Sequence, residues 1–279
     1  MPRLRRLAAR TASLSVLGLE LPLLALWGVL GTILSLIAAR VTDWNAMTDE
    51  LVYERLAISI AQTHSILPRL HGEVVRSLAQ LYPMLISPWF SHGYVPENLK
   101  NAHAFDAWLM SSACIPAFLL ARRVTDRRWP AYTLAVLTAC TPWIIYSTVL
   151  LTEVAAYPAF MWAMLGMHKA LTAPSARNDV LAFLGLALAF FARTQLVGLI
   201  AVLPVAMLVY ALTRPHTPVR AALKKTLRSH VTLACLYAAL AAAALGLIVS
   251  GRSLSSLSVY GNENTSPFPP GWAGSVTGH

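Results

Sequence analysis

Long apolar runs recur along the chain and are separated by short polar or basic segments. Four of them, residues 21–39, 129–152, 194–213 and 229–251, each contain at least 19 residues without Asp, Glu, Lys or Arg. A membrane-spanning helix needs about 20 such residues, because the hydrocarbon core is about 30 Å thick and each helical residue rises about 1.5 Å. One soluble core could not bury several runs of this length. The pattern therefore predicts an all-α polytopic membrane protein.

The finer pattern predicts about seven transmembrane helices in one module, residues 1–250. The predicted spans are residues 18–39, 103–121, 130–150, 153–170, 179–193, 195–213 and 230–250. The fifth span is short, so we expect it to be tilted or to form a bent unit with the sixth. Residues 251–279 are polar and contain several prolines and glycines, which predicts an outer tail or the start of a truncated loop.

Composition supports this interpretation and excludes other classes of protein. Hydrophobic residues make up 57% of the chain and charged residues 12%, about half the charged fraction of a soluble domain. The net charge of +10 does not indicate nucleic-acid binding, because the basic residues flank apolar runs. Cys114, Cys140 and Cys235 fall inside apolar segments, which excludes a disulfide framework, and no Cys/His cluster has zinc spacing. The basic N-terminus precedes an apolar stretch too long for a signal peptide, so we expect an uncleaved first helix.

The distribution of basic residues predicts the orientation of the chain. Fifteen of the 22 Lys and Arg residues fall in segments 1–17, 121–130, 169–178 and 214–229. Because cytoplasmic segments are enriched in Lys and Arg, we expect these four segments in the cytoplasm. The predicted location is the plasma (inner) membrane, with the N-terminus cytoplasmic and the loop of residues 40–102 outside.

This topology bears on two familiar classes of membrane protein. Seven spans with a cytoplasmic N-terminus place the C-terminus outside, which is the reverse of the seven-helix receptors. An ion-coupled transporter would carry ionisable residues at mid-membrane depth. Here Glu20 and Asp106 lie near the ends of predicted spans, so the sequence disfavours a transporter without removing that alternative.

The loop of residues 40–102 is the longest segment outside the predicted spans, and loops of this length are usually functional. From Thr48 to Gln62 apolar residues recur every fourth position, and a second apolar stripe runs from Glu73 to Phe90. Neither segment is long and apolar enough to span. We therefore expect two helices in the membrane interface, with Tyr82, Trp89 and Tyr94 at headgroup level.

The sequence Thr48-Asp49-Glu50 opens the first of these two helices. Its simplest interpretation is an N-cap followed by acidic residues that complement the helix dipole. A functional interpretation is that Asp49 presents a carboxylate where the first span meets the outer water. Neighbouring helical residues point about 100° apart, so Asp49 and Glu50 cannot both face one reacting atom. One can act as a base while the other binds a metal, a hydroxyl or the surroundings of the helix.

Several short motifs follow one another in a suggestive order. They are Thr48-Asp49-Glu50 with Tyr53, Leu81-Tyr82-Pro83, Thr152-Glu153 with Tyr157-Pro158, and Arg193-Thr194-Gln195. In this order the chain resembles the GT-C superfamily of polytopic glycosyltransferases, and most closely its dolichyl-phosphate-mannose protein mannosyltransferase and aminoarabinose transferase branch. The Lys-Pro-Pro stretch of the aminoarabinose-type members is replaced here by Leu-Tyr-Pro.

The resemblance implies transfer of a sugar from a polyprenyl-phosphate donor to an acceptor hydroxyl on a protein, lipid or polysaccharide at the outer face. Asp49 matches the general base of such a reaction, which would take the proton of the acceptor. Glu50 and Glu153 are expected to position the acceptor or a divalent cation, although Glu153 at the end of a span is equally well explained as a solvated charge. The sequence leaves the metal requirement open.

Five further residues are expected to contact substrate. Arg193 interrupts an apolar stretch at the outer boundary, where its guanidinium would bind a lipid phosphate with two hydrogen bonds. A plain interfacial arginine that reaches the headgroups explains the same position equally well. His71 is a second phosphate candidate or an ordinary loop histidine. Tyr53 and Tyr82 are expected to line a sugar pocket or to anchor the interface, and Gln195 belongs to the same motif as Arg193.

Two other functions remain open at this stage. A carrier or flippase for a lipid-linked substrate would share the basic outer residues but would not need a carboxylate base. An inactive fragment of a glycosyltransferase is the second alternative, because family members usually have more spans and often a soluble C-terminal domain. Activity with a labelled lipid-linked sugar separates glycosyl transfer from both.

Overall fold

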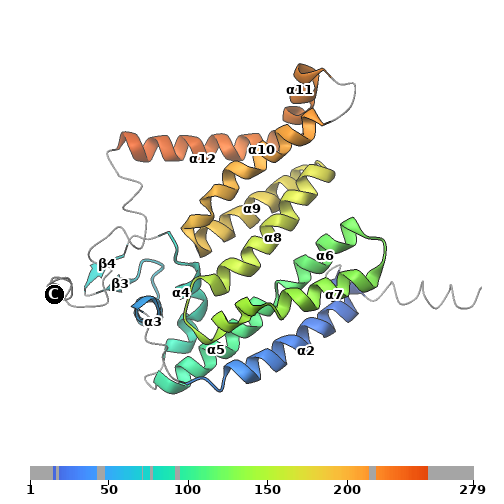
Figure 1. The fold of residues 1–279 in the computed structure, drawn as a ribbon. Helices are drawn as coiled ribbons and strands as arrows, with labels where there is room; N and C mark the ends of the chain where they lie inside the picture. Colours follow the sequence, from blue (N-terminus) through green and yellow to red (C-terminus); the bar gives the residue numbers. More distant parts are fainter. Residues whose placement is uncertain are drawn as a thin grey trace, which may run out of the picture.

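The computed structural model describes residues 15–16, 19–42, 48–70, 72–75, 78–91, 95–213 and 218–250. This part of the chain is mostly helical, and its helices pack side by side in an elongated bundle (Figure 1). The elements in chain order are β1 (Ser15–Val16), β2 (Leu19–Glu20), α2 (Leu21–Ala38), α3 (Thr48–Thr63), β3 (Arg69–Leu70), β4 (Glu73–Val74), α4 (Leu81–Ile86), the 3₁₀ turn η1 (Ser87–Phe90), α5 (Val95–Ser111), α6 (Cys114–Val124), α7 (Arg128–Ala139), η2 (Pro142–Thr148), α8 (Glu153–Thr172), α9 (Ala176–Ala192), η3 (Thr194–Val197), α10 (Gly198–Leu212), α11 (Val219–Ser229) and α12 (Val231–Val249).

Within the part of the chain that the structure describes, three helical segments are long and apolar enough to cross a membrane: Leu21–Ala38, Val95–Val124 and Thr194–Leu212. A fourth crossing is added if α11 and α12, which are bent by 82° at their junction, count as one span. These segments correspond to four of the seven predicted spans. The other three predicted spans fall on α7 and α9, with 12 and 17 residues, and on α8, which carries Glu153 and Lys169 near its ends. Seven crossings and their orientation stay predictions.

The predicted span at residues 130–150 differs from the structure. A regular helix stops at Ala139, and the 3₁₀ turn η2 takes over from Pro142 to Thr148. Proline lacks a backbone N–H and disfavours helical geometry at the residue before it, and Thr141 accordingly has an extended conformation (φ −63°, ψ 156°). The chain stays irregular until α8 begins at Glu153. This break leaves backbone groups near Leu150 available for contacts with other elements.

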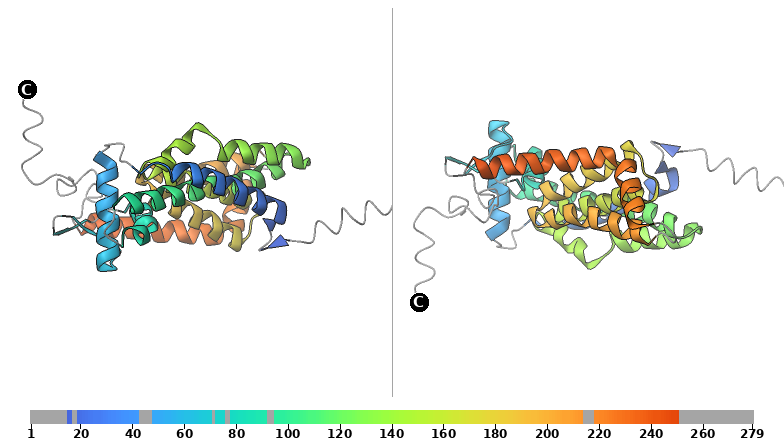
Figure 2. Two further views of the ribbon diagram at one scale, coloured as in Figure 1. Left: turned by 90° about the horizontal axis from the view of Figure 1, so that it is seen from below. Right: turned by 90° about the horizontal axis from the view of Figure 1, so that it is seen from above.

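The two halves of the predicted long loop have different outcomes. The first predicted helix is confirmed as α3, which lies crosswise over one end of the bundle, called here the α3 end (Figure 2). The second prediction is wrong over its first residues, because β3 and β4 form an antiparallel hairpin in which Leu70 pairs with Glu73. Gly72 allows this tight turn with its positive φ of 85°. Helical structure resumes only at Leu81, in α4 and η1.

The closest helix pair in the bundle is α8 with α9. A Cβ atom on Gly166 would lie 2.9 Å from the Cα of Ala182, and one on Gly185 would lie 2.9 Å from the Cα of Ala163. The two glycines therefore let the backbones touch, as small residues do at helix interfaces in membranes. Because α8 begins and α9 ends at the α3 end, this rigid pair positions the residues that flank them there.

A hydrophobic cluster forms the core of the α3 end and connects its helices. It contains buried residues from α3, α4, α5, α8 and the segment before α8, among them Leu56, Tyr82, Leu99, Leu150 and Val154. These residues lie far apart in the sequence but share one core. The cluster thereby brings the predicted site residues of α3 close to those that follow η2.

Candidate functional site

The acidic first turn of α3 is fixed to the segment that precedes α8. Glu50 is 2% exposed, and its Oε1 atom accepts a hydrogen bond of 3.2 Å from the backbone N–H of Leu150. Asp49 is half-buried and, being the adjacent helical residue, points about 100° away from Glu50. The structure therefore directs Glu50 inward, and Asp49 is the more exposed carboxylate of this pair.

Two predicted sugar-contacting tyrosines, one on α3 and one on α4, meet between these helices. Tyr53 and Tyr82 pack edge to face, with ring centroids 5.8 Å apart and an interplanar angle of 85°. Tyr82 is completely buried, and its hydroxyl donates a hydrogen bond of 2.8 Å to Oδ2 of Asp106. Burial, with the Asp106 charge second, raises the pKa of Tyr82 well above its usual value. Tyr82 is therefore a buried structural residue, which differs from both expectations for it, the wall of a sugar pocket and an anchor in the interface.

Asp106 and His103 are two polar residues of α5 to which the sequence analysis assigned no role in the site. The side chain of Asp106 is fully buried in α5, and no described residue partners its Oδ1 atom. His103, one turn earlier on α5, is also buried, and its Nδ1 atom lies 2.9 Å from the carbonyl oxygen of Val41. The spacing of three residues places both side chains on one face of a helix, which is the signal by which the sequence could have indicated them.

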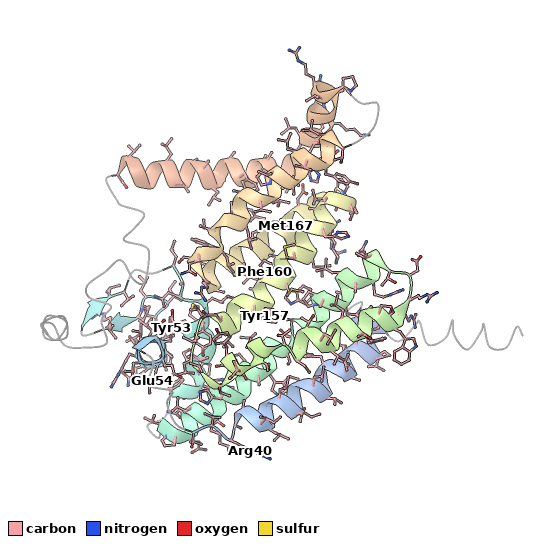
Figure 3. All side chains as sticks on the ribbon, in the orientation of Figure 1. Arg40, Tyr53, Glu54, Tyr157, Phe160 and Met167 are labelled. Carbon is pink, nitrogen blue, oxygen red and sulfur yellow. The ribbon has the colours of Figure 1, made fainter. Side chains whose placement is uncertain are left out.

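Glu54 is the other carboxylate that the sequence analysis passed over. It lies one helical turn after Glu50 on α3, is 3% exposed, and is labelled with Tyr53 in Figure 3. Burial raises the pKa of Glu54 from 4.5 to about 7, the nearby Arg55 guanidinium opposes this shift, and the Glu50 charge adds to it. A carboxyl with a pKa near 7 exchanges protons readily at neutral pH, which makes Glu54 a second candidate base at the α3 end. Its position four residues after Glu50, on the same face of the helix, is the signal by which the sequence could have indicated it.

Arg193, Glu153 and Gln195 come together where α9 ends and α8 begins. Arg193 has an extended backbone between α9 and η3 (φ −152°, ψ 113°), which turns the chain at that point. Its guanidinium forms an ion pair with Glu153 through Nη1, and its Nε donates a hydrogen bond of 2.7 Å to Oε1 of Gln195. All three residues belong to the predicted site, and the structure places them next to one another.

The ion pair borders a pocket of about 180 Å³. Its other walls are mostly apolar and come from α5, η2, α8 and η3; Tyr157 and Phe160 of this wall are labelled in Figure 3. The lining residues are Met110, Tyr146, Glu153, Ala156, Tyr157, Phe160, Arg193 and Leu196. One guanidinium at the rim of an apolar pocket suits a ligand with an anionic head and an apolar tail.

The remaining predictions for the site have mixed outcomes. His71 lies outside the described residues, as does Tyr94, so their predicted roles stay predictions. Within the described ranges no three His, Cys, Asp or Glu side chains are arranged to hold a metal ion. The structure thus gathers the predicted residues into two neighbouring groups, Glu50 with Tyr53 and Tyr82, and Glu153 with Arg193 and Gln195, both at the α3 end.

Comparisons with protein-family models, with curated proteins and with solved structures find no match to this chain. The family resemblance of the short motifs is therefore an expectation that rests on their residues and order. The geometry of the α3 end remains the basis for any functional conclusion.

Proposed function

We propose that this protein transfers a sugar from a polyprenyl-phosphate donor to an acceptor hydroxyl, with Asp49 as the general base. The observation that carries the proposal is the hydrogen bond between Glu50 and the backbone of Leu150. It holds the acidic first turn of α3 beside the segment that leads to Glu153, the partner of Arg193. A carboxylate and a guanidinium are the two groups that such a reaction needs, and both lie at the α3 end.

The proposed chemistry is a displacement at the anomeric carbon. The acceptor oxygen forms a bond to that carbon while Asp49 takes the hydroxyl proton, and the bond from the carbon to the phosphate oxygen breaks. The electron pair of that bond leaves with the lipid phosphate. Arg193 stabilises the charge that develops on the phosphate, because a guanidinium can donate two parallel hydrogen bonds to it. No strong acid is needed, since a phosphate is already a good leaving group.

The buried residues support the site without touching the substrate. Glu50, which we expected as a second catalytic carboxylate, is a positioning residue in this proposal, because its carboxylate is engaged with Leu150. Tyr82 packs against Tyr53 of α3 and donates a hydrogen bond to Asp106 of α5, so it connects α3 to the bundle. Glu153 neutralises Arg193 until the donor phosphate competes for the guanidinium.

The proposal includes a location. Helices Leu21–Ala38, Val95–Val124 and Thr194–Leu212 would cross the plasma (inner) membrane, and the α3 end would lie at its outer surface. Support comes from the basic residues, most of which fall in the segments assigned to the cytoplasm. A lipid-linked donor would then reach Arg193 from the bilayer, with its apolar chain along the helices.

The test is sugar transfer by the full chain in liposomes that contain radiolabelled polyprenyl-phosphate hexose, pentose or aminosugar, with acceptor hydroxyls inside and outside the vesicle. The Asp49→Asn variant should keep the fold and lower turnover by about 10²–10⁴, the usual contribution of a positioned base. Asp126→Asn, the same chemical change in the exposed turn between α6 and α7, is the matched control and should transfer normally.

Three outcomes would contradict this proposal. Near-normal transfer by Asp49→Asn would remove Asp49 as the base and leave Glu54 as the carboxyl to replace. Movement of the labelled donor across the bilayer without any transfer would favour a carrier or flippase. Absence of both activities in well-folded protein would favour the inactive fragment.

A further inference from the structure

Helix α11 is basic on one face and apolar on the other. Its basic residues are Arg220, Lys224, Lys225 and Arg228, and it contains no acidic residue. At about 100° per residue, Arg220, Lys224 and Arg228 follow one another at intervals of four along one stripe. Val219 and Leu227 each precede a residue of this stripe, so they belong to an adjacent apolar stripe about 100° away, and they are 55% and 63% exposed. The protein itself therefore leaves the apolar face of α11 largely uncovered.

The junction between α11 and α12 sets the direction of this helix. The two helices meet at an angle of 82°, and α12 (Val231–Val249) contains no charged residue. If α12 lies along the bilayer normal, α11 must lie almost parallel to the membrane plane. That is the orientation in which an amphipathic helix buries its apolar face among the lipids and keeps its basic face at the headgroups.

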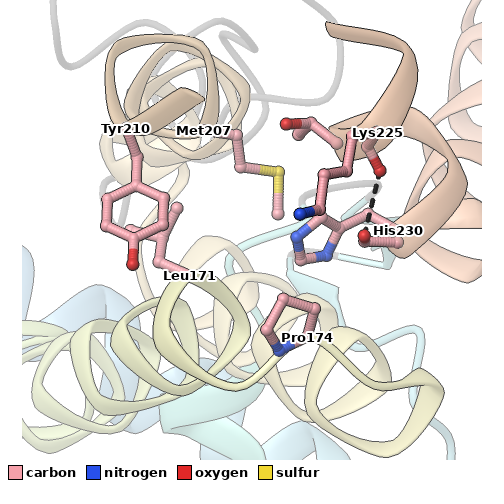
Figure 4. A pocket seen from close by; sticks show the side chains of 8 residues that line it. Leu171, Pro174, Met207, Tyr210, Lys225 and His230 are labelled. Carbon is pink, nitrogen blue, oxygen red and sulfur yellow. Dashed lines mark hydrogen bonds between the residues drawn. The ribbon is translucent and has the colours of Figure 1, made fainter. Parts of the chain in front are cut away.

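A buried polar contact holds the junction in place. His230 connects the two helices, and its Nδ1 atom donates a hydrogen bond of 2.7 Å to Oδ1 of Asp179 in the first turn of α9. Ser229 Oγ donates a hydrogen bond of 2.9 Å to the carbonyl oxygen of Lys225. Figure 4 shows Lys225 and His230 lining one small hollow with Pro174. Helix α11 lies at the end of the bundle opposite α3 (Figure 1). The contact between His230 and Asp179 thus fixes the orientation of α11 relative to the α8–α9 pair.

An apolar hollow lies directly beside α11, between α10 and α12. Its volume is about 290 Å³, and its lining includes Pro204, Met207, Leu208, Leu227, Leu233 and Tyr237. Leu227 contributes to this lining from α11 itself. An apolar chain that entered between α10 and α12 would therefore have its head at α11.

We propose that α11 and this hollow form a binding site for an anionic phospholipid. The negative headgroup lies against Arg220, Lys224, Lys225 and Arg228, and one acyl chain lies in the hollow between α10 and α12. Charge complementarity identifies the occupant, because four cations without a nearby acidic side chain on the same helix favour an anionic surface. This site lies at the opposite end of the bundle from the proposed glycosyl-transfer site and does not depend on it.

The test is native mass spectrometry of the full chain in detergent, titrated with dioleoyl-phosphatidylglycerol or dioleoyl-phosphatidylcholine. The phosphatidylglycerol should bind at least about tenfold more tightly. The triple variant Arg220→Gln, Lys224→Gln, Arg228→Gln should weaken its binding by about 100-fold, since each basic residue near an anionic headgroup contributes about a factor of five. Inorganic phosphate at millimolar concentration should not displace the lipid, because it cannot fill the hollow.

Two matched controls distinguish a specific lipid-binding site from non-specific electrostatic attraction. The variant Arg123→Gln, Arg127→Gln, Arg128→Gln removes the same charge from exposed positions around the α6–α7 turn and should bind lipid normally. Ala234→Phe fills the hollow and should lower the affinity for dioleoyl but not dihexanoyl phosphatidylglycerol, by about five- to tenfold. Ala239→Phe makes the same change on α12 outside the hollow and should have no effect.

Specific results would overturn the proposal. They are equal affinity for the two lipids, equal loss of binding in both triple variants, or displacement by inorganic phosphate. An unchanged affinity in Ala234→Phe would show that no acyl chain occupies the hollow, which also contradicts the proposed site.

Discussion

The carboxylate of Glu50 accepts a hydrogen bond from the backbone N–H of Leu150, at a distance of 3.2 Å and across 100 positions of sequence. The contact is buried, and it exists because η2 and the irregular residues after it leave the Leu150 N–H outside any helix. It joins the acidic helix α3 to the start of α8. The proposed base and the proposed phosphate-binding arginine are therefore held on one framework.

The first prediction concerns this contact. Glu50→Ala should lower the free energy of unfolding by about 1–3 kcal/mol, because a buried N–H loses its acceptor. Glu50→Gln retains an oxygen acceptor and should be destabilised less. Thermal unfolding of both variants in detergent measures the difference, and equal stability of the alanine variant and the native protein would show that the bond does not hold α3.

The second prediction concerns donor binding at Arg193. Arg193→Lys should weaken binding of a polyprenyl-phosphate sugar, because a point charge loses the two-pronged geometry of the guanidinium. Glu153→Gln should strengthen it, because the guanidinium then has no competing carboxylate. Each change should be about 3- to 30-fold, the value of one charge-assisted hydrogen bond. Donor affinity is measured by titration of the detergent-solubilised chain; a parallel loss in both variants would indicate that the ion pair is purely structural.

A third prediction follows from the raised pKa of Glu54, which is about 7 in the folded protein against 4.5 for an ordinary glutamate. The folded state binds the proton more tightly, so this stabilising contribution is present below pH 4.5 and is lost as the pH rises through about 7. The Tm of the native protein should therefore fall between about pH 5 and pH 8, and Glu54→Gln should reduce that fall. Glu97→Gln, on the exposed first turn of α5, is the control and should leave the profile unchanged.

A fourth prediction tests the close approach of α8 and α9. Gly166→Ala places a methyl group 2.9 Å from the Cα of Ala182, so the helices must separate. The expected loss of stability is about 1–3 kcal/mol, typical of overpacking. Gly28→Ala on α2 meets no atom within 4 Å and should be neutral or slightly stabilising, because alanine favours a helix. Thermal unfolding of the two variants checks the contrast, and an unaffected Gly166→Ala protein would contradict the tight interface.

The fifth prediction concerns orientation. In a cysteine-free background, single cysteines at positions 64 and 97 should react with an impermeant thiol reagent in intact cells. Cysteines at positions 125 and 220 should react only after the membrane is permeabilised, because the basic segments around them are expected in the cytoplasm. Labelling at position 125 but not at position 64 would reverse the orientation and place α3 inside.

Several of the helices could be predicted from the sequence. An uncharged run of about 20 apolar residues satisfies its backbone hydrogen bonds most simply as a helix, so α2, α10 and α12 follow directly from composition. The helix that begins at Thr48 also follows from local signals, its apolar period and its acidic first turn. Arg193 and Gln195 are only two residues apart, so their proximity could also be predicted from the sequence.

Only the tertiary structure decided how these helices meet and what the polar side chains do. The inward direction of Glu50, the burial of Tyr82 on Asp106 and the pairing of Arg193 with Glu153 depend on contacts between residues 24 to 100 positions apart. Periodicity within one helix defines which face is apolar but carries no information about which other segment covers that face. The burial of Glu54, and with it a pKa near 7, arises in the same way, because desolvation is a property of the packed neighbours and not of the residue itself.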